Sequence, residues 1–125
     1  MARTKAALSK DVLRKLGILS GYEDASAEDA ALVEARYDDK LEELRDKGLV
    51  YWSHTSRTSE DIPNVIYDAI VNVMCEAVAP YYGVTVPALT DDQGRPVSIG
   101  TKGLRDLRAH IAKQASGEPT RAVYF

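Results

Sequence analysis

The sequence predicts an all-α protein: a small bundle of about four helices with a short β-like arm or hairpin and an extended C-terminal tail. Three observations lead to this class. Apolar residues recur at helical spacing in four segments, and Gly and Pro separate those segments. The one stretch with alternating β-branched residues, 84–100, is short and contains two Pro and two Gly, which suits a hairpin.

The first two helices have clear boundaries in the sequence. Apolar residues four apart share one face over 5–16, and Gly17 is suited to end this helix in a left-handed conformation. Ser26 is suited to cap a second helix that runs to about Lys47, where Glu43 and Lys47 form an i,i+4 pair. One face of this helix is apolar and the opposite face is densely charged. The apolar stripe consists of Ala30, Val33, Tyr37, Leu41 and Leu44.

The third helix has the most apolar sequence. Pro63 suits its first turn, Asp61 is a candidate cap, and Pro80 is expected to kink or end it. Because most of its circumference is apolar and the chain is small, part of its surface is expected to face another subunit. The apolar positions are Ile62, Val65, Ile66, Ala69, Ile70, Val73, Met74, Ala77 and Val78. Beside them run a polar line, Asn64, Asp68, Asn72 and Glu76, and a semi-apolar row, Tyr67, Val71 and Cys75.

The polar line of the third helix has two interpretations. It is either the solvated side of the helix or a row that hydrogen-bonds a neighbouring subunit.

The remaining segments are shorter. Residues 49–52 are apolar and predict a short strand or a hydrophobic plug, and 53–61 predicts a surface loop. A last helix is expected over 101–115. Two regions follow: a helical domain over 1–115, with 84–100 as a loop or hairpin insertion, and an extended docking tail over 116–125. The tail carries the aromatic pair Tyr124 and Phe125, which is typical of an interface anchor, although a frayed terminus is the alternative.

Composition is ordinary for a soluble globular protein of 125 residues, with 45% apolar and 28% charged residues. No apolar stretch reaches the length of a transmembrane helix, and the N-terminal region has no signal-peptide core. A single cysteine excludes a disulfide within the chain. These features favour a cytoplasmic protein that does not enter a membrane.

Charge is unevenly distributed around a formal net charge of −3. Both ends of the chain are basic and the middle is acidic. This polarity favours head-to-tail contact between copies or docking on an acidic partner, and charged faces that merely contact water are the alternative.

Nothing in the sequence indicates catalysis, and no metal or cofactor site is expected. His54 and His110 lack metal-ligand spacing, and Cys75 lies mid-helix among apolar residues. The carboxylates of the second helix, Asp38, Asp39, Glu42 and Glu43, have no loop carbonyls nearby to complete a cation site. No phosphate-binding glycine loop, nucleophile elbow or zinc motif is present.

A small helical DNA-binding regulator is the alternative function. The last helix is basic, and short helical domains can read duplex DNA. The negative net charge and the long connection between the first two helices both argue against it.

The order of segments resembles the head–tail connector (adaptor) proteins of tailed bacteriophages, including the tail accessory factors of short-tailed phages. The resemblance covers most of residues 5–83 and is carried by VLRKLGIL at 12–19, SAEDAA at 26–31, the apolar passage after Gly48 and AVAPYYG at 77–83. A last Leu/Arg helix and a Tyr-Phe pair follow in the same order, whereas the segment 84–100 is longer than the family pattern.

The resemblance implies a non-enzymatic virion protein at the head–tail interface, assembled in the cytoplasm of the bacterial host. Such proteins form a homo-oligomeric ring, typically of twelve copies, which contacts the portal protein and the next tail or neck protein. Passing double-stranded DNA would traverse the ring without specific binding. The implied portal-docking residues are Arg121, Val123, Tyr124 and Phe125; the expected subunit interface is Tyr67, Val71, Asn72 and Glu76; the expected channel-facing acids are Asp38, Asp39, Glu42 and Glu43.

Overall fold

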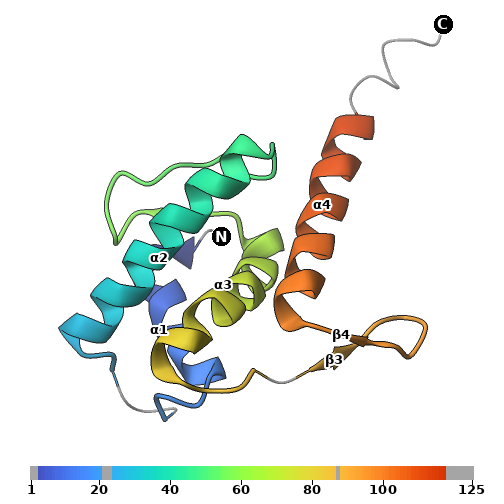
Figure 1. The fold of residues 1–125 in the computed structure, drawn as a ribbon. Coiled ribbons are helices and arrows are strands. Elements are labelled where there is room, and N and C mark those ends of the chain that lie inside the picture. The colour runs from blue at the N-terminus through green and yellow to red at the C-terminus, as the bar shows by residue number, and fades with distance from the viewer. Residues whose placement is uncertain (1–2, 21–23, 87, 118–125) are drawn as a thin grey trace, which may run out of the picture.

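The computed structural model describes residues 3–20, 24–86 and 88–117, with the side chains of 114–117 left undescribed. The chain is mostly helical, with two small antiparallel sheets (Figure 1). In chain order the elements are β1 (Arg3–Thr4), α1 (Lys5–Lys15), α2 (Ala27–Asp46), β2 (Glu60–Ile62), the 3-10 turn η1 (Asn64–Ile66), α3 (Tyr67–Tyr82), β3 (Leu89–Thr90), β4 (Pro96–Val97) and α4 (Ile99–Gly117).

The predicted ends of the first two helices are confirmed. Gly17 follows α1 with φ of +79°, a conformation that glycine adopts without steric cost. The Ser26 hydroxyl caps α2 by accepting a hydrogen bond from the amide of Asp29 at 3.1 Å. The Glu43–Lys47 pair also forms, at 3.5 Å.

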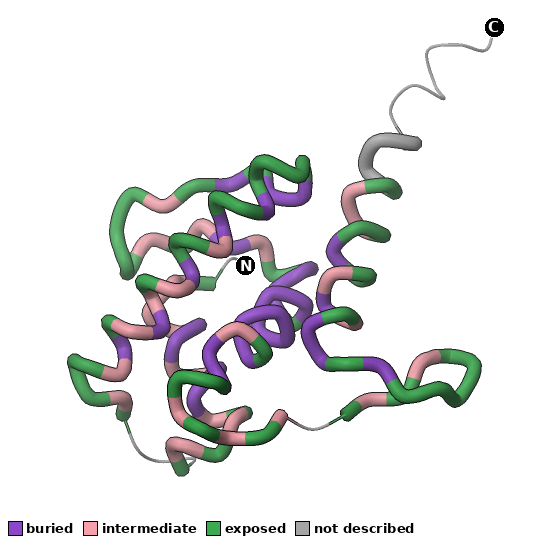
Figure 2. Tube along the Cα trace, in the orientation of Figure 1, coloured by how far each residue is buried: buried purple, intermediate pink, exposed green. Residues whose placement is uncertain are grey.

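The core surrounds α3, which lies between α1 and α2 on one side and α4 on the other (Figures 1 and 2). Nearly every residue of α3 from Tyr67 to Cys75 is buried, with only Asp68 exposed. The largest fully buried side chains come from all four helices and β2: Tyr37, Leu8, Leu13, Ile62, Ile70, Met74, Ile99 and Leu107. Burial of these side chains supplies the main stabilisation of the fold.

The start and end of the third helix differ from the sequence prediction. Pro63 precedes η1, and the regular helix begins only at Tyr67, without a side-chain cap from Asp61. Val65, predicted to lie on the apolar stripe, is 80% exposed, because the 3-10 turn breaks the helical register. At the other end Pro80 lies inside α3, which continues to Tyr82 and stops before Gly83 at φ of +64°.

The segment between α2 and η1 contains a plug and a strand. Leu49, Val50 and Trp52 are buried without strand pairing, so residues 49–52 form the predicted hydrophobic plug and not the alternative short strand. The predicted surface loop over 53–61 ends in β2, which pairs with β1 in antiparallel register, Arg3 opposite Ile62.

The antiparallel pair β3–β4 confirms a hairpin within 84–100, but its strands are not the predicted 84–86 and 97–99, and Ile99 and Gly100 already belong to α4. Its turn is held by the Asp91 carboxylate, which accepts hydrogen bonds from the amides of Gln93 and Arg95 at 2.9 Å each. The last helix is longer at both ends than the predicted 101–115.

At the crossing of α3 and α4, Gly103 allows the two helix backbones to approach closely, whereas Gly100 lies against the side chain of Glu76. Among the described residues, no helix is both long and apolar enough to cross a membrane.

Candidate functional site

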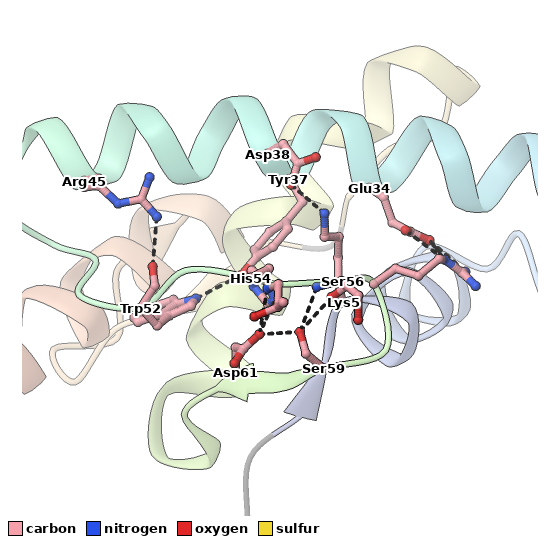
Figure 3. A network of polar contacts seen from close by, with 12 residues as sticks. Lys5, Glu34, Tyr37, Asp38, Arg45, Trp52, His54, Ser56, Ser59 and Asp61 are labelled. Carbon is pink, nitrogen blue, oxygen red and sulfur yellow. Dashed lines mark hydrogen bonds and ion pairs between the residues drawn. The ribbon is translucent and has the colours of Figure 1, made fainter.

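A buried polar network joins α2 to the segment 49–62 (Figure 3). The Tyr37 side chain leaves α2, is 1% exposed, and meets the indole of Trp52 and the ring of His54. Trp52 Nε1 donates to the Tyr37 hydroxyl at 3.0 Å, and the same hydroxyl lies 2.7 Å from His54 Nε2. Because indole only donates, the hydroxyl accepts from Trp52, and the direction of its hydrogen bond with His54 Nε2 follows the tautomer of His54.

The other nitrogen of His54 faces Asp61. His54 Nδ1 lies 3.5 Å from Asp61 Oδ2 and has no hydrogen-bond partner among the described residues. The Asp61 carboxylate accepts from the Ser59 hydroxyl and from the amide of Thr55. A neutral His54 with its proton on Nδ1 directs that proton to the carboxylate and accepts from the Tyr37 hydroxyl at Nε2.

The electrostatics of this network favour neutral rings beside one carboxylate. Burial lowers the pKa of His54, and the nearby Asp61 only partly opposes that shift. Burial also raises the pKa of Tyr37 well above its ordinary value. The Ser59 hydrogen bond lowers the pKa of Asp61. The group has the partners of a proton relay, but the His54 side chain is only 5% exposed, so a substrate has no access to it.

Further contacts extend this network along α2. Arg57 forms a bidentate ion pair with Glu34, with Nη2 to Oε2 at 2.9 Å, and Arg45 donates to the Trp52 carbonyl at 2.8 Å. Lys5 forms an ion pair with Asp38 at 2.9 Å. These contacts connect α2 to the segment 49–62 and to the start of α1, so the network stabilises the fold.

No metal site is found in the described part of the chain, and its cysteine is buried. There, no three His, Cys, Asp or Glu side chains gather closely enough to hold a metal ion. Cys75 is fully buried, and burial raises the pKa of its thiol to about 11, which suppresses the reactive thiolate. His110 lies at the surface against Tyr51, with ring centroids 6.2 Å apart.

The four acids predicted to face a channel are all exposed on α2, but three of them have cationic partners. Besides the Lys5–Asp38 pair, Asp39 lies 2.6 Å from Arg36, and Glu43 contacts Lys40 at 3.0 Å. The Lys40 hydrogen bond lowers the pKa of Glu43. The sequence indicated the acidic face but not the cation from α1 that meets it. The orientation of Asp38, Asp39, Glu42 and Glu43 toward a channel stays a prediction.

The residues expected at a subunit interface have partners within one chain. Tyr67, Val71 and Asn72 are all buried inside the single chain. The Tyr67 hydroxyl donates to Asp11, and Asn72 accepts from Lys15, so both side chains contact α1 within one chain, and their place in a subunit interface stays a prediction. Glu76 is the exposed member of the set and lies over Gly100 of α4. The portal-docking residues Arg121, Val123, Tyr124 and Phe125 lie outside the described residues.

Two surface features were missed by the sequence prediction. A groove of about 200 Å³ lies between α2 and the end of α3, where Arg36 stacks over the exposed Tyr81 ring at 5.5 Å. A second groove, of about 370 Å³, lies between the start of α3 and α4. It is lined by Val65, Ile66, Asp68, Ala69, Asp106, Ala109, His110 and Lys113, and is called the Val65 groove below. The sequence prediction missed this groove because it assumed an unbroken third helix, which placed Val65 on the apolar stripe.

No protein-family model, curated protein or solved structure matches the chain.

Proposed function

We propose that this chain is a structural adaptor of a tailed bacteriophage, which forms a ring between the portal and the tail or neck and extends the DNA channel. The proposal starts from the resemblance of residues 5–83 to head–tail connectors and adds the arrangement of the elements. It assigns no catalytic step, cofactor or metal.

The observation that carries the proposal is the outward extension of α4 and the β3–β4 hairpin. α1, α2 and α3 form a body, α4 packs on α3 and continues past that body, and the hairpin extends from its base (Figure 1). A ring subunit needs elements that reach beyond its own core to a neighbour and to the structures above and below. The hairpin, which is longer than the family pattern, is proposed to serve such a contact.

Charge supplies a second argument. α2 carries eight acidic and three basic residues, whereas the described part of α4 exposes Arg105, Arg108 and Lys113. In a head-to-tail ring, the basic α4 of one copy would approach the acidic α2 of the next. Cations already paired on α2 weaken this attraction, because they neutralise part of its charge.

The channel role rests on the same helix. A wall with net negative charge lacks the phosphate-neutralising contacts that hold DNA, so duplex DNA can slide along it. Glu42, which has no ion pair among the described contacts, and the partly neutralised Asp38, Asp39 and Glu43 are the proposed wall residues.

The experiment is a pull-down with the portal protein encoded nearby in the same genome. The full chain is compared with a chain that lacks residues 116–125 and with a Ser53→Ala control in the exposed loop before β2. Retention by the portal, lost in the shortened chain and kept in the control, supports the adaptor role and assigns docking to the tail. Retention of the shortened chain supports the adaptor role and moves docking to the helical body.

Failure of the full chain to bind the portal contradicts the proposal. Duplex DNA binding that weakens steeply with salt would then favour the helical regulator.

A further inference from the structure

We propose that the Val65 groove is the binding site for the segment of this same chain that follows α4, with the aromatic pair Tyr124 and Phe125 as its anchor. The groove and the segment are adjacent in the fold, because Lys113 on the groove rim is one turn before the end of α4. The proposal concerns the free chain and does not depend on a portal; docking of the same segment on a portal would require it to leave the groove.

The groove has the composition of a site that is covered by another surface. In the described residues, three large hydrophobic side chains are exposed: Tyr51, Val65 and Tyr81. Two of them gather here, since Val65 lines the groove and Tyr51 stacks on its His110. Ile66 and Ala69 form a buried apolar floor. Aromatic side chains gain most from such a floor, because they bury a large area at little cost in conformational entropy.

The length of the segment allows it to reach the groove. From Gly117 back to His110 is seven residues of helix, or roughly 10 Å along the axis. The eight residues 118–125 span up to about 26 Å when extended, so a chain reversal after α4 brings Tyr124 and Phe125 to the level of His110. Gly117 and Pro119 are residue types that chain reversals use.

Charge agrees with this occupant. The segment carries Arg121 three residues before the aromatic pair, and the groove presents the exposed carboxylates of Asp68 and Asp106 together with one exposed ammonium group, that of Lys113. Asp106 already lies 3.6 Å from Lys102, so Asp68 is the stronger partner for a further cation. A second copy of the chain is the competing occupant, and the experiment separates the two.

The experiment is NMR on the full chain with labelled valine methyl groups. Ring currents from a docked aromatic side chain shift the Val65 methyl resonances upfield. We expect this shift in the wild-type chain, its loss in a Tyr124→Ser/Phe125→Ser double variant, and its retention in a Tyr81→Ser control, which removes an exposed aromatic side chain elsewhere. We also expect the shift to persist on serial dilution, because both partners belong to one molecule.

Two results would overturn the proposal. Identical Val65 resonances in the wild type and the double variant would leave the groove without this occupant. A shift that disappears on dilution, together with a dimer in sedimentation, would assign the groove to a second copy. Since Val65 is 80% exposed, a Val65→Asp variant is expected to fold, and it provides the reverse test. In this variant we expect the amide resonances of residues 123–125 to match those of a free peptide of the same sequence.

Discussion

Replacement of Gly103 by alanine is expected to destabilise the protein, because Gly103 of α4 packs directly against the backbone of α3. A Cβ at this position would lie 2.5 Å from the carbonyl oxygen of Ala69 and 2.9 Å from a methyl group of Val73. The first of these atoms belongs to the backbone of the central helix. Neither helix can relieve the contact without moving against the other.

The magnitude follows from two opposing effects. Alanine is about 1 kcal/mol better than glycine inside a helix. Overpacking of a core costs about 1–3 kcal/mol, and a clash with backbone belongs in the upper half of that range. We therefore expect the free energy of unfolding of Gly103→Ala to fall by about 1–2 kcal/mol, which lowers Tm by roughly 4–8 °C.

Gly100→Ala is the matched control, one turn earlier in α4. Its added Cβ would meet only the Glu76 side chain, 1.9 Å from Oε2, 2.6 Å from Cδ and 3.0 Å from Cβ. The exposed carboxylate can rotate away, and the contact with Cβ then needs a shift of a few tenths of an ångström. The gain in helix propensity then remains, so its stability should equal or slightly exceed that of the wild type. Thermal and urea unfolding followed by circular dichroism measure both variants. If Gly103→Ala is as stable as Gly100→Ala, the close approach of α3 and α4 is wrong.

Three further predictions concern the network and the helix start. Tyr37→Phe leaves the buried Trp52 Nε1 and His54 Nε2 without their shared partner, so urea unfolding should show a loss of about 2 kcal/mol, whereas an unchanged midpoint would contradict the network. Burial depresses the pKa of His54, so below the ordinary value of 6.5 the unfolded chain binds more protons at this residue than the folded chain does. The free energy of unfolding should therefore fall as pH drops from 7 to about 5, and His54→Gln should flatten that slope. Ser26→Ala removes the α2 cap and should cost about 1 kcal/mol in thermal unfolding, with Ser26→Asp restoring it; equal stability of all three chains would argue against the cap.

Local sequence signals predicted the helices well, because caps and glycine stops act through neighbours in the chain. Ser26 and Gly17 are such signals, and both ends are found where they were expected. The hairpin over 84–100 was predicted for the same reason, from Pro and Gly around a polar turn. The beginning of α3 was not, since Val65 and Ile66 continue the apolar spacing although the chain there forms a 3-10 turn.

Contacts between distant segments lay beyond the sequence prediction. The pairing of β1 with β2 joins segments more than fifty residues apart through only a few residues, too short to produce a period. The hydrogen bond between Tyr37 and His54 was also not predicted, because Tyr37 was assigned to an apolar stripe and nothing in the sequence indicates a partner for its hydroxyl. The neutralisation of Asp38 by Lys5 likewise depends on how α1 packs against α2.

The adaptor role is tested most directly by electron microscopy of the full chain mixed with the portal encoded in the same genome. The account predicts a closed ring of this protein on the portal, coaxial with its channel and with α2 facing the lumen. Portals that remain bare at saturating protein concentration would contradict it.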